Sequence, residues 1–410
     1  MDYYLSPRWS GEVADCSMPM TFDQYNNCGY KCLYCFSTYQ RGIGSGKESY
    51  FSNAVKPVSV KRIKKMFLEP ETTHFGEYIE RRMVMQWGGL SDPFCPFEQK
   101  YGVGLELLKF FREIDYPICF STKGTWWLDD ARYTDLFRDN PKWNVKVSII
   151  TLNEKFAKVI EKGTPTSAKR LEALEKIARL NCGGATLRFR PFMFGISNPG
   201  HQELVLEAGK RGATAVSLEF FCLEQRSPVL RNERLAIISG LVGFDYFDFY
   251  RKYSVSTGYL RLNRNIKRRF VDEIEAATRE AGMRFYVSDA HFKERCDNGS
   301  CCGLSSDWNY SRGQFCEALV MCKKKGRVSW DDIEGNMEHL QNVMLHSAQN
   351  LMTPKKGARF FGFTLFDYMR WLWNHPKAGQ SPYTMFEGVM KPVGLDENGD
   401  LIYELDRARL

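Results

Sequence analysis

The sequence contains no apolar run that approaches the roughly 20 residues of a membrane-spanning helix. Its first residues, MDYYLSPRWSGEVADC, also lack the charged and then apolar pattern of a secretory signal. Internal repeats and low-complexity tracts are absent as well. We therefore expect a soluble globular protein that is cytoplasmic and has no membrane partner.

Cysteine, in contrast, is abundant, with 13 among 410 residues. A reducing cytosol keeps thiols free, so an odd number of cysteines without an export signal argues against a disulfide framework and favours metal ligation. With 43% hydrophobic and 14% aromatic residues, the chain can bury a large core. The length predicts one large domain with an extension, or two domains.

The formal net charge of +8 is moderate, but the basic residues are clustered. The clusters are Arg261, Arg264, Lys267, Arg268 and Arg269, then Lys323, Lys324, Lys325 and Arg327, and finally Lys355 and Lys356. Such clusters can bind phosphates. Solvated helix faces or loops are the alternative interpretation.

Strand-like apolar runs alternate with helix-like stretches over the first half of the chain. The expected strands are 20–25, 82–88, 116–124, 143–152, 186–195 and 214–221, and the expected helices are 97–114, 128–139, 167–180 and 201–212. This alternation predicts right-handed βαβ units and a parallel sheet, with about six units.

Beyond about residue 225 the pattern changes. Aromatic and basic helices are followed by a short strand at 283–289, a cysteine-rich segment, an aromatic helix within 360–374 and a hairpin around Asn398-Gly399. We therefore expect an α/β core at 1–225 and a C-terminal extension at 226–410.

Three closely spaced cysteines, Cys28, Cys32 and Cys35, lie in the segment CGYKCLYC, where Gly29 relieves crowding beside the first. Iron–sulfur clusters are held by cysteine thiolates at short, uneven spacings. Three thiolates leave one iron of a four-iron cluster without a protein ligand, which makes that iron a place for chemistry. A zinc knuckle and three buried thiols are the alternatives.

The CxxxCxxC spacing, with Tyr34 before the third cysteine, resembles the radical S-adenosylmethionine (SAM) superfamily. The resemblance implies a [4Fe–4S] cluster whose open iron is chelated by SAM, and a partial (β/α)6 barrel. It agrees with the count of six βα units. In such a barrel the active groups lie at the carboxyl ends of the strands. A reductant such as flavodoxin or ferredoxin is the implied partner.

The segment after the second expected strand, GGLSDP, resembles the GGxSDP form of the spore-photoproduct-lyase-like branch of this superfamily. It implies that Gly88, Gly89, Ser91 and Asp92 contact SAM, with Asp92 in the acidic role by analogy. An ordinary turn is the alternative. Cys95, just beyond, is a candidate hydrogen-atom donor or further ligand, or else a structural thiol.

Polar residues end the following strands in the order that the resemblance requires. Ser121 and Lys123 end one strand, and Lys123 is a candidate to contact the SAM carboxylate or the substrate. Ser148 and Thr151 follow the next and could bond ribose hydroxyls, while Arg188 and Arg190 suit a carboxylate. Alternate residues of a strand share a face, so both arginines point either to the barrel or to the helices. Ordinary strand-end hydrogen bonds are the alternative for each.

A second group of cysteines lies within 291–322, in a segment rich in Gly, Ser and Asn. It predicts an auxiliary iron–sulfur cluster, or less favourably a zinc site of four thiolates. The expected ligands are Cys296, Cys301, Cys302 and Cys316, with Cys322 as a possible replacement.

The implied reaction is reductive cleavage of SAM to a 5′-deoxyadenosyl radical, which abstracts hydrogen from a substrate carbon. The lyase-like GGLSDP segment, the basic clusters and the aromatic residues Trp308, Tyr310, Trp371 and Trp373 together favour rearrangement or modification of a nucleobase or its side chain in DNA. The alternatives are modification of a peptide or small amino-acid-like molecule, and a non-enzymatic zinc- or cluster-bearing nucleic-acid binder.

Overall fold

The computed structural model describes residues 8–9, 16–38, 54–224, 228–254, 259–312, 314–349 and 358–409. Contacts within the chain divide it into two compact units. Unit 1 is Met1–Ser6, Phe22–Lys64 and Gln86–Phe285, and unit 2 is Pro7–Thr21, Lys65–Met85 and Tyr286–Leu410. The residues from 228 to 285 thus fall in the same unit as the expected α/β core, past the boundary expected near 225.

The largest sheet has the strand order β1-β2-β3-β4-β5-β6-β7-β10. Its strands are β1 (Arg8–Trp9), β2 (Met20–Phe22), β3 (Met85–Trp87), β4 (Ile118–Thr122), β5 (Trp143–Ser148), β6 (Ala185–Phe192), β7 (Ala215–Phe220) and β10 (Arg284–Val287). Strands β4 to β7 pair in parallel, and β1 pairs antiparallel with β2. All six expected core strands are present. The sheet also contains β1 and β10, and β10 is the strand expected only as part of the extension.

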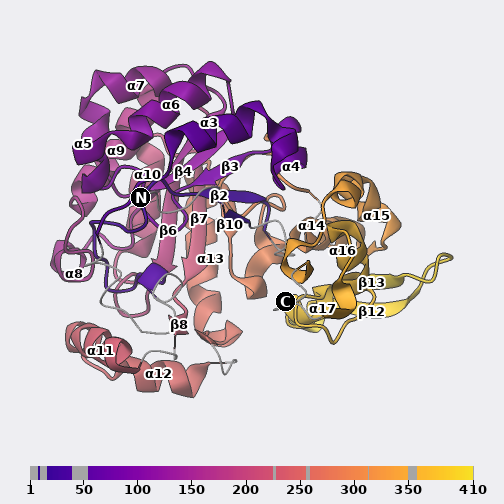
Figure 1. Cartoon of the computed structure of the whole chain (residues 1–410). Coiled ribbons are helices and arrows are strands. Elements are labelled where there is room, and N and C mark those ends of the chain that lie inside the picture. The colour runs from indigo at the N-terminus through magenta and orange to yellow at the C-terminus, as the bar shows by residue number, and fades with distance from the viewer. Residues whose placement is uncertain are drawn as a thin grey trace. The chain divides into compact units, whose positions relative to one another are not determined.

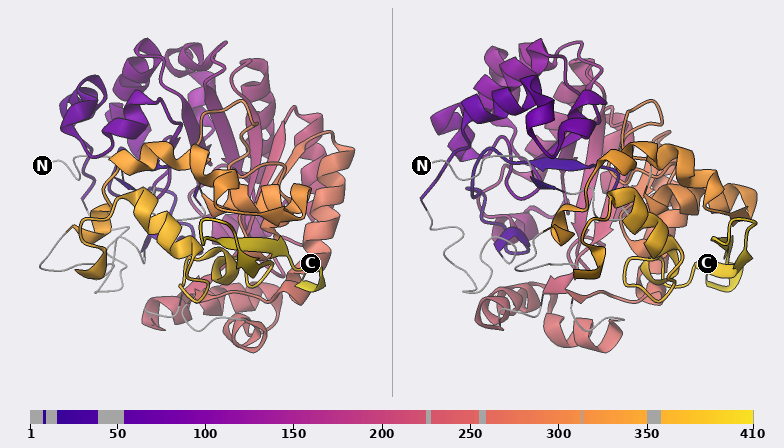
Figure 2. Two further views of the ribbon diagram at one scale, coloured as in Figure 1. Left: turned by 90° about the vertical axis from the view of Figure 1, so that its right-hand side faces the viewer. Right: turned by 45° about the vertical axis from the view of Figure 1, so that its right-hand side comes forward.

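The helices that follow these strands cover the outside of the sheet (Figures 1 and 2). They are α3 (Val60–Leu68), α5 (Pro96–Tyr101), α6 (Val103–Glu113), α7 (Ala131–Phe137), α8 (Glu154–Ile160), α9 (Ser167–Arg179) and α10 (His201–Lys210). Helix α4 (Gly76–Glu80) belongs to unit 2. The helix expected at 97–114 is split at Gly102, whose φ of 65° ends α5. The expected α/β partial barrel is therefore present.

Three further helices complete unit 1: α11 (Pro228–Val242), α12 (Tyr246–Tyr253) and α13 (Arg264–Glu280). Helix α13 packs against α10, and the short strands β8 (Leu223–Glu224) and β9 (Tyr259–Leu260) pair antiparallel. Lys267 of α13 is 1% exposed, with its amine 5.7 Å from the centre of the Phe220 ring. It therefore cannot contact a phosphate at the surface.

Unit 2 contains helices α14 (Phe315–Lys325), α15 (Asp331–Glu334), α16 (Leu365–Trp373) and α17 (Pro382–Met385). Its sheet has the order β11-β13-β12, built from β11 (Arg327–Val328), β12 (Met390–Leu395) and β13 (Leu401–Leu405). The hairpin turns at Gly399, where φ is 80°. The aromatic helix and the hairpin expected from the sequence are both present.

Two of the four aromatic residues expected to stack on bases are buried in unit 2. Trp373 is fully buried and packs on Tyr403, while Tyr310 is 1% exposed under the guanidinium of Arg312. The sequence alone could not separate core from surface aromatics, because both follow the same helical or loop pattern. Trp373 and Tyr310 are therefore not base-stacking residues.

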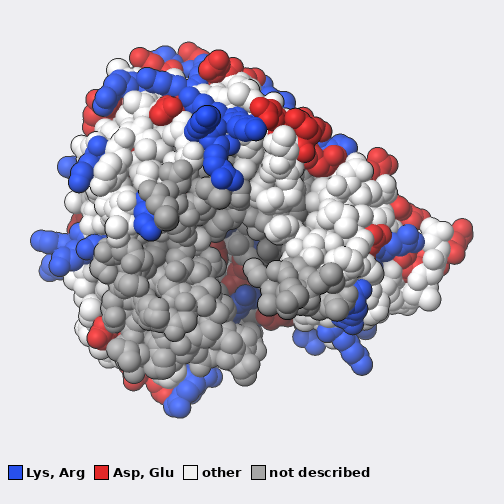
Figure 3. Space-filling view, viewed as in Figure 1, with Lys and Arg blue, Asp and Glu red and all other residues white. Residues whose placement is uncertain are grey.

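The basic clusters are partly neutralised by neighbouring acids. Lys325 pairs with Asp332, Arg327 with Glu404, and Arg269 with a carboxylate of its own helix. On the face shown in Figure 3, Lys and Arg side chains are interspersed with Asp and Glu. Lys355 and Lys356 lie outside the described residues. In these pairs the basic side chains are helix-face and strand-edge charges, which is the alternative that the sequence left open.

No helix among the described residues is both long enough and apolar enough to cross a membrane.

Candidate functional site

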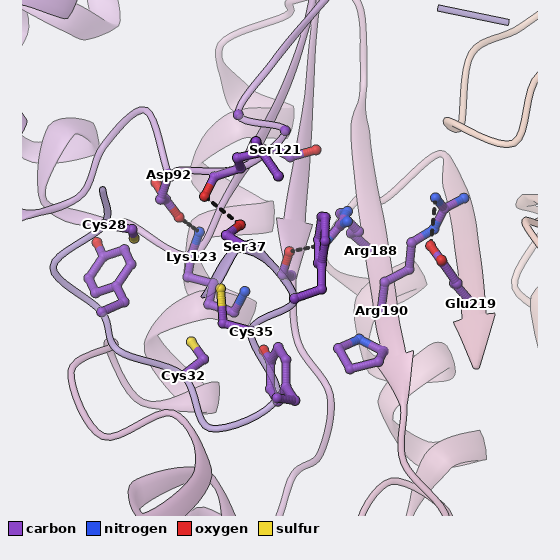
Figure 4. Close-up of a pocket in the computed structure, with 18 of the residues that line it drawn as sticks. Cys28, Cys32, Cys35, Ser37, Asp92, Ser121, Lys123, Arg188, Arg190 and Glu219 are labelled. Carbon is purple, nitrogen blue, oxygen red and sulfur yellow. Dashed lines mark hydrogen bonds and ion pairs between the residues drawn. The ribbon is translucent and has the colours of Figure 1, made fainter. Parts of the chain in front are cut away.

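A cavity of about 420 Å³ in unit 1 gathers most of the residues expected to carry chemistry. The cysteine loop forms one side of it, and the carboxyl ends of strands β4 to β7 form another (Figure 4). The predicted residues that line it are Cys28, Cys32, Tyr34, Cys35, Gly88, Gly89, Ser91, Asp92, Ser121, Lys123, Ser148, Arg188 and Arg190. Thr151 and Cys95 are not among its lining residues.

The cysteine loop is held against the barrel by backbone contacts. Leu33 donates its N–H to the carbonyl of Ile160 at 2.8 Å, and Gly163 donates to the carbonyl of Tyr30 at 3.3 Å. A Cβ atom on Gly163 would lie 2.8 Å from that same carbonyl oxygen, so a larger residue there would displace the loop. The three cysteines therefore have a fixed position at the cavity edge.

The three thiols are buried enough to disfavour a free thiolate. Burial raises the pKa of Cys32 and Cys35, although the Lys123 ammonium acts in the opposite direction. The pKa of Cys28 is raised by its hydrogen bond with Cys95 and by burial. A bound metal would lower the pKa of these thiols, because its positive charge stabilises the thiolates that bind it.

Among the described residues, no three His, Cys, Asp or Glu side chains are arranged to hold a single metal ion. A tetrahedral zinc site needs thiolates about 2.3 Å from one centre, so the cysteine loop is not a preformed zinc knuckle. A four-iron cluster takes one thiolate per iron and needs its ligands farther apart. The three thiols of the cysteine loop line one cavity and fit such a cluster, while Cys222, which also lines the cavity, follows β7.

Cys95 lies behind the wall. It is fully buried at the N-terminal end of α5 and packs with Tyr25, Tyr30 and Cys32. A hydrogen-atom donor to a bound substrate must face the cavity, so this position does not suit the donor role considered for Cys95. Thr151 is 1% exposed, and its hydroxyl accepts the N–H of Asn153 at the start of α8. Thr151 therefore does not suit a ribose contact.

Tyr34 anchors the loop to a buried ion pair. Its hydroxyl donates to Glu161, whose other oxygen lies 2.7 Å from the guanidinium of Arg170, and neither side chain of this ion pair is exposed. The Lys123 amine is 4.0 Å from Glu161 and 5.5 Å from the centre of the Tyr34 ring. Burial by itself raises the pKa of Glu161, but Arg170 and Lys123 outweigh burial and lower it.

The GGLSDP loop is braced from beneath by an aspartate that the sequence analysis missed. Asp23 follows β2, and its Oδ1 accepts the N–H groups of Leu90 and Ser91 at 2.8 and 2.7 Å. The Ser91 hydroxyl donates to the same oxygen at 3.3 Å. A carboxylate directly after a strand, with a partner loop 67 residues later, carries no sequence signal of its own.

Asp92 is engaged mainly by the protein itself. Its carboxylate accepts hydrogen bonds from the N–H of Phe94 at 2.9 Å, the hydroxyl of Thr122 at 2.7 Å and the N–H of Lys123 at 2.6 Å. Burial nevertheless raises its pKa. A carboxylate has about four lone-pair sites, so at most one remains for a ligand. Asp92 therefore joins the loop to the end of β4, and its analogy with an acidic SAM ligand is weakened.

Strands β5 to β7 supply the basic side of the cavity. Arg188 donates to the Ser148 hydroxyl at 3.3 Å, and Arg190 pairs with Glu219 at 3.3 Å. Both arginines line the cavity, which agrees with the expectation that they share a face. Figure 4 shows them across the cavity from the three cysteines. Arg261, from one of the basic clusters, also lines it.

The C-terminal cysteines lie in unit 2 and are mostly buried. Cys296 is 5% exposed, and its thiol donates to the Val287 carbonyl at 3.2 Å. Cys322 is fully buried, with its thiol 3.8 Å from the Tyr403 carbonyl of β13. Cys302 and Cys316 are buried and Cys301 is half-buried. No three of these thiols converge on a single-ion site in the described part of the chain, and the auxiliary cluster stays a prediction.

Comparison with known proteins gives similarity in structure alone. No protein-family model matches the sequence, and no curated protein matches it. A cysteine-to-serine mutant of spore photoproduct lyase has a TM-score of 0.52 and 17% identity, with 70% of this chain and 80% of that chain covered. A cysteine-to-alanine mutant of the same enzyme with dinucleoside spore photoproduct has a TM-score of 0.50 and 15% identity over the same shares. The resemblance to this branch of the radical SAM enzymes is confirmed as a similarity of fold.

Proposed function

We propose that this chain is a radical SAM enzyme that binds a [4Fe–4S] cluster through Cys28, Cys32 and Cys35 and binds SAM in the adjoining cavity. The observation that carries the proposal is the position of all three thiols on one wall of the cavity formed by the strand ends. Once reduced by flavodoxin or a chemical reductant, such a cluster would supply the one electron that cleaves the SAM sulfonium into methionine and a 5′-deoxyadenosyl radical.

The chain's own residues have defined tasks in this proposal. Tyr34 and Glu161 hold the loop, while Asp23 and Asp92 hold the GGLSDP segment at the cavity edge. Lys123 and Arg188 supply positive charge that suits the carboxylate of SAM. The barrel wall limits the access of water and competing hydrogen donors to the bound substrate.

The test is anaerobic purification followed by iron and sulfide analysis and an assay for 5′-deoxyadenosine from SAM with a chemical reductant or flavodoxin. Cys32→Ala should abolish the product and lower the iron content. Cys182→Ala is the matched control, because Cys182 is a half-buried thiol outside the cavity. Product formation by Cys32→Ala at the wild-type rate would refute the site.

For the substrate we propose a nucleobase or its side chain in DNA. Two observations support this proposal. The cavity wall carries Lys31, Lys123, Arg188, Arg190 and Arg261 against Asp92 and Glu219, an excess of basic groups that suits a phosphate. One structurally similar lyase carries a dinucleoside spore photoproduct.

Fluorescence anisotropy with a labelled DNA duplex tests this proposal. Binding that weakens steeply with salt, and that Arg261→Ala weakens further, is the expected result. SAM cleavage with no salt-dependent DNA binding would instead support a peptide or amino-acid-like substrate.

A further inference from the structure

Beneath the cavity, three polar side chains from neighbouring strands form a hydrogen-bonded chain. The Lys146 amine of β5 donates to Oε1 of Gln86, which lies in β3. The Gln86 amide nitrogen Nε2 donates to the hydroxyl of Ser121 at 3.0 Å and to the carbonyl of Trp87 at 3.1 Å. Ser121 is the last but one residue of β4, and Lys146 is its register partner in β5. All three residues are at least nine-tenths buried, with Lys146, Gln86 and Ser121 at 2%, 7% and 7% exposure.

The lysine ammonium fixes which group donates and which accepts in each of these hydrogen bonds. An ammonium group has donors and no acceptor, so the Gln86 atom that faces it must be the carbonyl oxygen. The amide nitrogen therefore faces Ser121, and the flip of this amide is determined without seeing its hydrogens. The Ser121 oxygen must then accept, and its own proton must point elsewhere.

Ser121 lines the cavity, as Figure 4 shows. Within the described residues, its hydroxyl proton has no protein acceptor. A buried hydroxyl that cannot donate to its protein neighbours is suited to donate to a ligand. The cost of burying Lys146 beneath the cavity is also reduced if an anionic or electron-rich group binds above it.

We propose that Lys146 and Gln86 are positioning residues that fix Ser121 as a hydrogen-bond donor to an oxygen of bound SAM. The inference rests on the proposed function and goes beyond it, since it assigns a task to two residues that do not line the cavity. The recognised chemistry is a carboxylate or hydroxyl oxygen that accepts the Ser121 proton.

The decisive variant is Gln86→Glu, which keeps the size and shape of the side chain. A glutamate accepts from Lys146 and can also accept from Ser121. The direction of the hydrogen bond between residue 86 and Ser121 is therefore reversed. Ser121 then donates to residue 86 and no longer to the ligand. We expect the dissociation constant for SAM to rise about tenfold. The glutamate also loses the bond to the Trp87 carbonyl, while its charge attracts the Lys146 amine, so the thermal midpoint should change little.

Two further variants separate positioning from a merely structural role. Ser121→Ala removes the donor directly and should raise the dissociation constant by about the same factor. The double variant Gln86→Glu/Ser121→Ala should bind SAM no more weakly than Ser121→Ala alone, because each change removes the same hydrogen bond between Ser121 and SAM. Gln202→Glu, on the exposed face of α10, is the control for the added charge.

The readout is equilibrium dialysis of SAM against anaerobic, cluster-loaded protein, together with the thermal midpoint. Wild-type affinity in a folded Gln86→Glu variant would overturn the inference and leave the proposed function intact. If Gln86→Glu does not fold, Ser121→Ala decides in the same way. A wild-type protein that holds its cluster but binds no SAM would overturn both the inference and the proposed function.

Discussion

Glu161 and Arg170 form a fully buried ion pair, with 2.7 Å between Oε2 and Nη2. Arg170 also donates to the carbonyl of Ser148 at 2.8 Å, while Glu161 accepts the hydroxyl proton of Tyr34. One charged pair thus ties the end of β5 to the residue before the third cysteine. The position of the cysteine loop therefore depends on residues far from it in the sequence.

Arg170→Met should destabilise the protein by about 3 to 5 kcal/mol, because it leaves the Glu161 charge buried without its partner. The iron content should fall as the Tyr34 anchor loosens. The double variant Glu161→Gln/Arg170→Met removes both charges and should recover part of the lost stability. Urea unfolding monitored by fluorescence measures both effects. Equal stability of the single variant and the wild type would contradict this role of the pair.

Gly88→Ala should distort the cavity. At Gly88 φ is 96°, and a Cβ atom would lie 2.5 Å from the carbonyl oxygen of Ser121. We expect a loss of about 2 kcal/mol or more, together with weaker SAM binding. Gly240→Ala, in α11, is the control, since a Cβ there meets nothing within 4 Å. It should be neutral or stabilising by up to about 1 kcal/mol. A thermal shift of similar size in both variants would argue against a specific steric clash at Gly88.

Asp92→Asn should lower stability by about 1 to 3 kcal/mol, because an amide has one acceptor oxygen where the carboxylate has two. At least one of the bonds to Phe94, Thr122 and Lys123 must be lost. Asp135→Asn, at an exposed ion pair with Arg138, is the control and should change stability by less than about 0.5 kcal/mol. Chemical denaturation measures both variants. An Asp92→Asn variant as stable as this control would contradict the bracing role.

His339 should make unit 2 sensitive to mild acid. Burial and the charge of Arg81 lower the pKa of His339 from its ordinary value of 6.5 to about 4. The folded state thus binds the proton less readily than the unfolded state does. Stability is therefore complete above the unfolded pKa and falls as the pH drops from 6.5 toward 4.

When the pH falls from about 7 to about 5, this histidine should lower the free energy of unfolding of the wild type by about 2 kcal/mol. His339→Phe keeps the edge contact with Tyr78 and cannot be protonated, so it should lose less stability over the same range. Thermal midpoints at the two pH values, with the exposed His375→Gln as control, measure the difference. Parallel pH profiles for His339→Phe and the wild type would remove His339 as the cause.

If the C-terminal cysteines bind an auxiliary cluster, the protein should still contain iron after the cysteines of the loop are replaced. A protein with Cys28, Cys32 and Cys35 all replaced by alanine should keep iron and sulfide bound at Cys296, Cys301, Cys302 and Cys316. Iron and sulfide analysis of the anaerobic protein measures them. The addition of Cys296→Ala should remove this remainder. A triple variant without iron, sulfide or zinc would show that these cysteines are structural thiols.

The sequence by itself determined the order of strands and helices in the barrel and the cysteine triad beside it. Both are local patterns: hydrophobic alternation and three thiols within eight residues. The strand-end residues Ser121, Lys123, Ser148, Arg188 and Arg190 followed from the order of the strands, because parallel strands bring their carboxyl ends to one edge.

The tertiary structure alone decided what surrounds these residues. In the structure Asp92 accepts hydrogen bonds that hold the GGLSDP loop, and neither Cys95 nor Thr151 lines the cavity. Trp373 is buried, and Lys146 contacts Gln86, which is 60 residues away in the sequence. Tyr34 and Glu161 are 127 residues apart. Such contacts depend on how distant strands and loops pack together, and a local sequence pattern contains no record of that packing.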